Sequence, residues 1–198
     1  MSIFDLEQIT VEGKGDSDQH ALTLYSIAVG SKAKRILELG VRNGASTYPL
    51  LMAAVKNGGE LTSVDISETS FKSSYEHRTS WKFVKMDAVE FLKQQKPSQP
   101  YDMIFIDDWH SYEHVRDELA EIDRLVSPRT VILLHDLMYG NTQPHYHSDL
   151  TQKTGQWANG GPYRAVAELN PQFWEFATLP YNNGLTLLRK KYSNKYFS

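Results

Sequence analysis

The stretch ILELGVRNGAST, residues 36–47, constrains the fold more than any other part of the chain. An apolar run with an embedded carboxylate, Glu38, leads into a turn bracketed by Gly40 and Gly44, and residues 45–54 continue as a helix-forming segment. This order predicts a strand, a tight turn and a helix. In an open α/β sheet the first such turn lies beside the ligand-binding crevice, because the strand order reverses there.

The chain repeats this alternation as far as residue 136. Further strands are expected at residues 61–64, 81–86, 101–106 and 130–134. Helices are expected at residues 67–78, 88–94 and 110–126. Strands that alternate with helices imply right-handed βαβ crossovers and a doubly wound sheet.

Both ends of the chain depart from this rhythm. Residues up to Asp18 are polar and punctuated by glycine, so we expect an arm or loop, with Ser17 available to cap a helix over residues 19–29. Residues 137–160 lack periodicity, and a loop of that length in a compact domain is usually a functional lid. A helix over residues 162–169 and two strands, 173–178 and 185–189, joined by PYNNG, should complete the chain.

We therefore expect a single α/β domain over residues 1–198, with a doubly wound, Rossmann-like, mostly parallel seven-stranded sheet and a C-terminal antiparallel strand pair. Its parts would be an N-terminal arm and helix, a ligand-binding core, a lid loop, and a final helix with the strand pair, at residues 1–30, 35–136, 137–160 and 161–190.

Composition excludes several classes of protein. The net charge of -3 gives no basic surplus for nucleic acid, and the absence of cysteine excludes disulfides and thiolate metal sites. No apolar run approaches the roughly 20 residues of a membrane span. We expect a cytoplasmic protein with neither nucleic acid nor membrane as a partner, and the sequence leaves a homo-oligomer open.

Five acidic residues lie at or near the carboxyl ends of the expected strands: Glu38, Asp65, Asp87, Asp107 and Asp136. In a parallel sheet these ends form one rim. Carboxylates that converge there repel one another unless they accept hydrogen bonds or meet a cation. The rim therefore predicts a positively charged or hydroxyl-rich ligand.

The turn itself separates two classes of nucleotide ligand. Asp65 follows Gly40 by 25 residues, a suitable position for accepting both hydroxyls of a ribose. A pyrophosphate, however, needs the denser G-x-G-x-x-G pattern, and here Arg42 takes the middle position while Glu38 lies on the strand beneath. A sulfonium compound that carries an ammonium group suits this environment better than a nicotinamide dinucleotide.

Five motifs in order, ILELGVRNGAST, LTSVDIS, KMDAVEFL, YDMIFIDDWHSYEHVRDEL and VILLHDL, resemble the class I S-adenosylmethionine-dependent methyltransferases. The likeness spans about Arg35 to Asp136. It is greatest to the small O-methyltransferase branch that includes catechol O-methyltransferase-like and natural-product sugar-modifying enzymes. The resemblance implies methyl transfer from S-adenosylmethionine to an oxygen of a small-molecule acceptor.

The resemblance also assigns cofactor-binding residues. It puts Glu38, Gly40 and Gly44 around the methionine part, with Ser46 helping to hold its carboxylate. Asp65 and the adjacent Ile66 would meet the ribose, and Asp87 and Ala88 would frame the adenine. From the residues alone, two glycines four apart can mark only a tight turn, and Asp87 is equally suited to capping the helix that follows it.

For catalysis the resemblance points to the tetrad Asp107-Asp108-Trp109-His110. Its first acid is a metal ligand in the catechol-type enzymes, and His110 replaces their lysine base. With an unperturbed pKa near 6.5, His110 would accept a hydroxyl proton around neutrality. The alternative is that Asp108 and His110 only cap the long helix.

A divalent metal, Mg²⁺ or Mn²⁺, is the second expected cofactor. Asp136 matches another metal-ligand acid of the family, but Leu137 stands where an asparagine is expected, so His135 is the substitute third ligand if its side chain turns toward the rim. The sequence PHYHSD, with His145, His147 and Asp149, also permits a zinc site, although it fits ordinary lid sequence better.

Aromatic residues in or beside the expected lid could cover an acceptor or pack the lid against the body of the domain. They are Tyr139, Tyr146, Trp157 and Tyr163. Two rival functions remain at this point. One is a binding protein that keeps the S-adenosylmethionine pocket without turnover, and the other is an NAD(P)-dependent oxidoreductase, which the turn disfavours.

Overall fold

The computed structural model describes residues 3–15, 17–138, 155 and 157–191, and its centre is one seven-stranded sheet in the order β3-β2-β1-β4-β5-β7-β6. The first five strands pair in parallel, and β7 pairs antiparallel with both β5 and β6. The strands are β1 (Arg35–Leu39), β2 (Glu60–Asp65), β3 (Trp81–Lys85), β4 (Met103–Ile106), β5 (Val131–His135), β6 (Trp174–Leu179) and β7 (Leu185–Lys190). This is the expected doubly wound, mostly parallel sheet with its antiparallel terminal pair.

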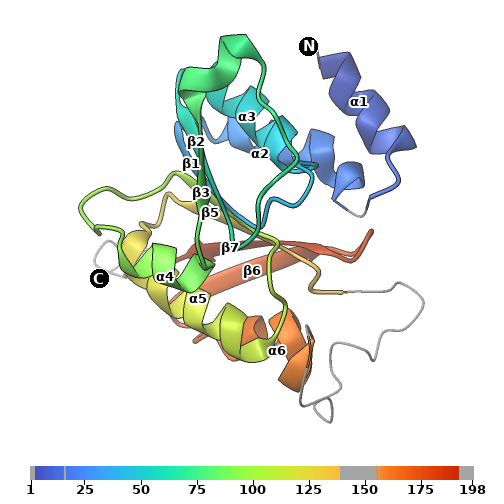
Figure 1. Ribbon diagram of the computed structural model, residues 1–198. Coiled ribbons are helices and arrows are strands. Elements are labelled where there is room, and N and C mark those ends of the chain that lie inside the picture. Colours follow the sequence, from blue (N-terminus) through green and yellow to red (C-terminus); the bar gives the residue numbers. More distant parts are fainter. Residues whose placement is uncertain (1–2, 16, 139–154, 156, 192–198) are drawn as a thin grey trace.

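Helices cover both faces of the sheet (Figure 1). One layer holds α1 (Ile3–Glu12), α2 (Ala21–Gly30) and α3 (Thr47–Lys56). The opposite layer holds α4 (Ala88–Lys93), α5 (Tyr112–Leu125) and α6 (Gly161–Ala167). Three short 3-10 helices complete the described secondary structure: η1 (Asp18–His20), η2 (Tyr75–Ser80) and η3 (Ala158–Gly160).

Alternating side chains of the central strands supply the two hydrophobic cores. Leu37 and Ile104 point into the core beneath α4, α5 and α6, whereas Ile36 and Phe105 point into the core beneath α2 and α3. Every residue of β4 is buried, as expected for a central parallel strand covered on both faces. The sheet is therefore a rigid platform for the loops at its edges.

Two expectations about secondary structure are wrong. The N-terminal arm contains the helix α1, because Leu6 is fully buried in the core that α2 and α3 share. Residues 67–78 form no α-helix, since Thr69 donates a hydrogen bond to the carbonyl of Arg42, and Phe71 packs edge-on against Trp81. Contacts with residues distant in the sequence thus determine the conformation of both segments.

The β6–β7 hairpin turn returns to the carboxyl edge of the parallel strands. There the backbone N–H of Met138 donates a 2.7 Å hydrogen bond to the carbonyl of Asn183. Asn182, Asn183 and Gly184 all adopt positive φ, which explains why the turn has the sequence PYNNG. The hairpin therefore forms one side of the region in which the acidic residues gather.

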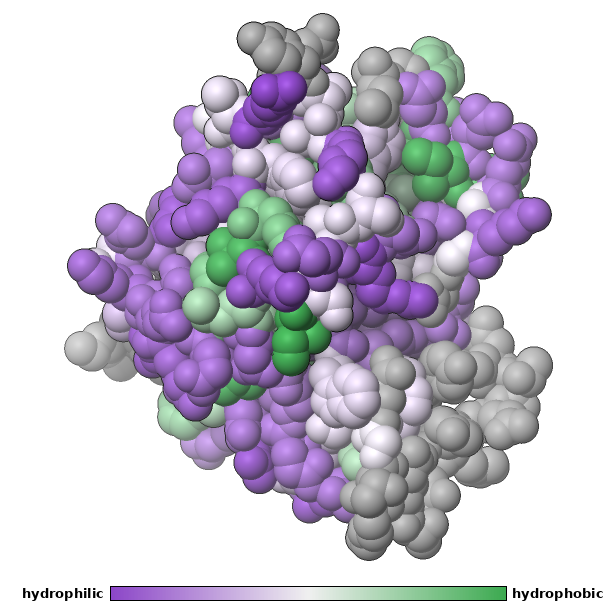
Figure 2. Space-filling view, in the orientation of Figure 1, coloured by the Kyte–Doolittle hydropathy of each residue, from purple (hydrophilic) through white to green (hydrophobic). Residues whose placement is uncertain are grey.

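Figure 2 shows a mostly hydrophilic face with hydrophobic residues in a few small patches. Within the described ranges, no helix combines the length and apolar character needed to cross a membrane.

Candidate active site

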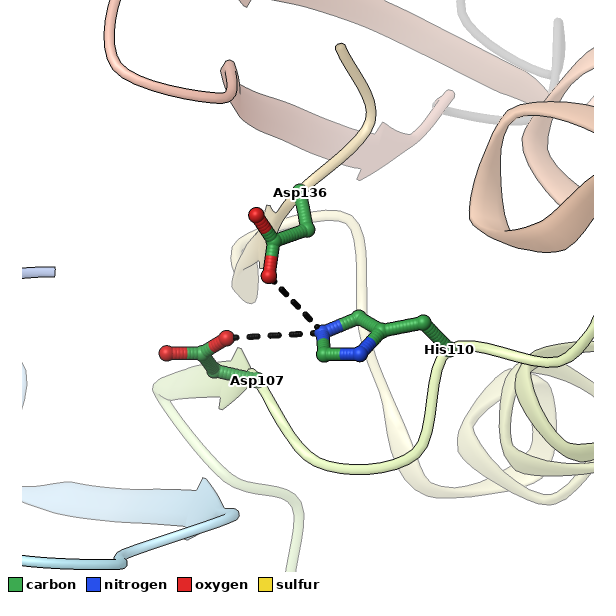
Figure 3. A group of neighbouring side chains, drawn as sticks. All are labelled: Asp107, His110 and Asp136. Carbon is green, nitrogen blue, oxygen red and sulfur yellow. Dashed lines mark ion pairs between the residues drawn. The ribbon is translucent and has the colours of Figure 1, made fainter. Parts of the chain in front are cut away.

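Three side chains from two loops meet at the carboxyl edge of the sheet (Figure 3). Asp107 directly follows β4, Asp136 directly follows β5, and His110 lies between β4 and α5. His110 Nε2 is 3.0 Å from Asp136 Oδ2 and 3.6 Å from Asp107 Oδ1. One imidazole nitrogen thus faces two carboxylates.

The side chains of His135 and Ser17 contact Asp107 of the triad. His135 Nδ1 lies 3.3 Å from Asp107 Oδ1, and its Nε2 lies 3.1 Å from the carbonyl of Asn182 in the β6–β7 turn. On the other side, the hydroxyl of Ser17 donates a 2.7 Å hydrogen bond to Asp107 Oδ2. Ser17 was expected only as a helix cap, and it makes no side-chain cap in the structure.

The charges of the cluster explain its pKa values. Burial alone would lower the pKa of His110, but the neighbouring carboxylates of Asp107 and Asp136 outweigh burial and raise it to about 9. The same balance raises the pKa of His135 to about 11. Burial would raise the pKa of Asp107, yet the two histidines hold it below its usual range. The expectation of an unperturbed pKa for His110 is therefore wrong, because the sequence did not show that two acids face it.

The triad fits a divalent cation. One ligand atom each from Asp107, His110 and Asp136 lies within 4.8 Å of the other two. Asp136 Oδ1 is buried without a hydrogen-bond partner among the described residues. Asp136 also adopts φ 64°, a conformation that costs a non-glycine residue free energy and that functional sites tend to retain.

The third residue of the cluster differs from the expected one. His135 does turn toward the two acids, but His110 completes the compact group of ligand atoms. Leu137 is buried in the core beneath α5 and so has a packing role. The residue that caps α5 is Ser111, whose hydroxyl accepts the backbone N–H of His114, so Asp108 and His110 are not its caps.

An aromatic side chain covers the triad. The ring of Trp157 stacks on His110 with centroids 4.3 Å apart and planes 13° apart. Tyr163 is half exposed on α6. Most of the expected lid, with Tyr139, Tyr146 and the zinc candidates His145, His147 and Asp149, lies outside the described residues.

A pocket of about 350 Å³ adjoins the triad and includes Asp107 in its wall. Asp65, Ile66, Asp87 and Ala88 line it, together with Trp109, whose side chain is half exposed. A second pocket of about 250 Å³ shares Gly40, Arg42 and Asp107 with the first and is closed by residues of the N-terminal segment. A wider groove of about 530 Å³ between α1 and α3 does not include the triad, so we assign ligand binding to the two smaller pockets.

Two of the expected ligand residues also hold the pocket together. Asp65 Oδ2 accepts the backbone N–H groups of Val41 and Arg42, and its Oδ1 accepts that of Ser67. The carboxylate therefore fixes the turn after β1 and keeps one acceptor position on Oδ1 for a ligand. Asp87 is the N-cap of α4, accepting the N–H of Glu90, while it also lines the pocket.

Glu38 does not line either pocket but is fully buried beneath the turn. Its oxygens accept hydrogen bonds from the hydroxyls of Ser46, Thr47 and Ser63 at 2.5 to 3.0 Å. Burial nevertheless raises its pKa to about 7. The structure thus corrects the idea that all five acids face a ligand: Glu38 and the Ser46 hydroxyl bind each other, although Ser46 borders the smaller pocket.

The two glycines of the turn have different roles. At Gly40, with φ 89°, a side chain would overlap the carbonyl of Asp107, so glycine allows β1 and β4 to end side by side at the pocket. At Gly44, with φ 88°, a side chain would overlap the ring of Phe71. Gly44 therefore serves packing in this structure and lines neither of the two smaller pockets.

Comparison with known sequences identifies one family. The family described as "Methyltransferase domain" matches residues 37–137, about half of the chain. A highly reducing polyketide synthase, AFT9-1 of Alternaria alternata, is 25% identical over 180 residues. That alignment covers 80% of this chain but only 6% of the synthase, so the chain spans a small part of the length of this curated relative.

Solved structures share the fold. The O-methyltransferase TomG of Streptomyces achromogenes, solved with S-adenosylmethionine, superimposes with a TM-score of 0.66 at 17% identity, covering 96% of this chain and 89% of TomG. MycE methyltransferase of the mycinamycin biosynthetic pathway, solved with Mg and S-adenosylhomocysteine, gives 0.64 at 16% identity, covering 99% of this chain and 56% of MycE. At these identities the likeness establishes the fold alone. The family match itself covers the turn after β1, the 350 Å³ pocket and the triad. The chain therefore belongs to the methyltransferase domain family.

Proposed function

We propose that this chain transfers a methyl group from S-adenosylmethionine to an oxygen atom of a small-molecule acceptor. The observation that carries the proposal is the triad of Asp107, His110 and Asp136 at the wall of a pocket lined by Gly40 and Asp65. Methyl transfer is an in-line displacement, so a donor and an acceptor held side by side gain much of the rate from alignment alone.

The pocket supports the donor half of the proposal. Asp65 Oδ1 has capacity to accept a ribose hydroxyl, and Ile66, Ala88 and Trp109 offer apolar surface for a flat adenine ring. Asp107 brings negative charge to the end of the pocket where a sulfonium would lie. TomG and MycE, which share the fold, were solved with this donor or its demethylated product.

The triad supports the acceptor half. An acceptor hydroxyl beside the triad can donate to Asp136 Oδ1, which has no hydrogen-bond partner among the described residues, and this contact would orient the acceptor oxygen. The two carboxylates and the His110 imidazole would hold Mg²⁺ or Mn²⁺, and a bound cation would favour the deprotonated acceptor. The Trp157 ring stacked on His110 would limit the access of water.

The class of acceptor follows from the relatives and from the charge of the protein. TomG is involved in tomaymycin synthesis, MycE belongs to the mycinamycin biosynthetic pathway, and the third relative is a polyketide synthase, which together support a small hydroxylated natural product as the acceptor. A net charge of -3 gives no support to nucleic acid as the acceptor. The rival of a binding protein without turnover predicts donor affinity with no product, whatever acceptor is offered.

The test is a methyl-transfer screen with hydroxylated aromatic and sugar acceptors, which measures S-adenosylhomocysteine with and without EDTA. His110→Ala should lower turnover by about 100-fold or more and leave donor affinity unchanged, because general acid–base groups and bound cations act on the reacting oxygen. His77→Ala is the matched control, since His77 hydrogen-bonds only to Ser74 in the structure and lies outside both pockets. Equal loss of turnover and donor affinity in His110→Ala would refute the assignment.

A further inference from the structure

A second group of ionisable side chains, Asp108, His114 and Glu118, adjoins the same 350 Å³ pocket. Asp108 comes from the loop after β4, and His114 and Glu118 come from the first two turns of α5. His114 and Glu118 are four residues apart, so they share one face of the helix. One ligand atom from each of the three residues lies within 4.8 Å of the other two.

Most carboxylate oxygens of this group have no hydrogen-bond donor among the described residues. His114 Nε2 lies 2.9 Å from Asp108 Oδ2, but it is 3.7 Å from Glu118 Oε1, beyond hydrogen-bonding distance. Asp108 Oδ1 and both oxygens of Glu118 are buried with no partner among the described residues. Three of the four carboxylate oxygens in this group are therefore buried without a hydrogen-bond partner among the described residues.

Glu118 is the residue that most needs an explanation. Its side chain is 0% exposed, although Asp117 and Asp123 on the same helix are exposed. Burial, followed by the charge of Asp108, raises its pKa well above the usual range. A buried carboxyl without a partner costs several kcal/mol, as an order of magnitude, unless a proton or a cation compensates it.

We propose that Asp108, His114 and Glu118 form a binding site for a divalent transition-metal ion, Zn²⁺ or Mn²⁺, separate from the triad of Asp107, His110 and Asp136. One imidazole nitrogen and two carboxylates are ligands that suit these ions. With a neutral imidazole, the two negative charges balance the ion. The inference does not depend on methyl transfer.

The position of the site indicates its route of entry and its effect. Asp108 and His114 line the pocket with side chains 18% and 17% exposed, so an ion can reach them from solvent. Coordination would tie the loop that carries Asp107 and His110 to helix α5. The ion would act as a clamp that positions the triad, and the three ligands are positioning residues.

The test uses the full chain, stripped with a chelator and titrated by calorimetry with Zn²⁺ alone and with Mn²⁺ alone. Wild type should bind two ions. Glu118→Gln should lose one binding event, with its affinity reduced by about 100-fold or more, and the matched variant Asp136→Asn should lose the other. Wild type that binds no ion, or Glu118→Gln that binds as many ions as wild type with unchanged affinity, would overturn the proposal.

A second measurement does not depend on how the variants fold. Wild-type crystals soaked in Mn²⁺ should show an anomalous peak between Asp108, His114 and Glu118. A peak only between Asp107 and Asp136 would mean that Glu118 is compensated by a proton shared with Asp108, and the second site would be abandoned. Loss of the second ion with retained donor binding would leave the proposed methyl transfer intact.

Discussion

Replacing Glu38 by glutamine tests how the turn after β1 is held together. Glu38 is fully buried among three hydroxyl groups, and burial raises its pKa from 4.5 to about 7. The pKa of this carboxyl is higher in the folded state than in the unfolded state, so the protonated form stabilises the fold. This stabilisation is complete when the pH is below the unfolded-state pKa, and it is lost as the pH rises through the folded-state pKa. At 1.36 kcal/mol per pH unit, the loss between pH 4.5 and pH 8 is about 3 kcal/mol.

Glu38→Gln keeps the shape of the side chain and removes the titration. Urea unfolding of wild type and variant between pH 4.5 and pH 8 gives the difference in free energy of unfolding, in which the titrations of all other groups cancel. We expect wild type to lose about 3 kcal/mol relative to Glu38→Gln across this range, most of it below pH 7. A difference that does not change with pH would mean that the three hydroxyls keep Glu38 ionised, and our account of the turn would be wrong.

Three further predictions follow from single contacts. Gly40→Ala should reduce the free energy of unfolding by clearly more than Gly58→Ala in urea titrations, because both glycines have positive φ but only Gly40 has the Asp107 carbonyl against it; equal losses would show that the close approach is unimportant. Asp87→Ala should cost about 1 kcal/mol in the same assay through loss of the α4 N-cap, and no change would contradict that role. Ser17→Ala should lower turnover while leaving the melting temperature within a few degrees, because the Ser17 hydroxyl contacts Asp107 Oδ2; unaffected kinetics would exclude Ser17 from the site.

Local patterns were sufficient to predict the sheet. The strands around Val64 and Ile104 are apolar runs that end at acidic residues, and the strand around Leu37 is an apolar run that contains Glu38 and ends at a glycine turn. The PYNNG turn was equally predictable from the sequence, because positive φ at successive positions favours asparagine and glycine. These features depend on neighbours in the sequence, which is why a single sequence shows them.

Segments determined by distant contacts were not predictable in this way. The helix α1 forms around Leu6, whose partners lie in α2 and α3. Residues 67–78 have a helical pattern, but Thr69 and Phe71 bind the turn after β1 instead. No local signal distinguishes these cases, because the stabilising partner is far away in the chain.

The candidate active site likewise combines features that the sequence predicts with features that depend on distant contacts. Placing Asp107, His110 and Asp136 together followed from strand order and from the family resemblance, since all three follow the ends of adjacent strands. The sequence could not show that Ser17 reaches Asp107, that Asn182 supports His135, or that Glu118 turns inward on α5. Each of these depends on how side chains from separate segments pack around one edge of the sheet.

Isothermal titration of the purified chain with S-adenosylmethionine and with S-adenosylhomocysteine tests the central claim most directly. We expect one molecule of either compound to bind per chain, and Asp65→Ala to weaken both, because Asp65 fixes the turn and offers an acceptor to the ribose. If neither compound produces heat over temperatures at which the chain is folded, the pocket does not bind this donor and the proposed function is wrong.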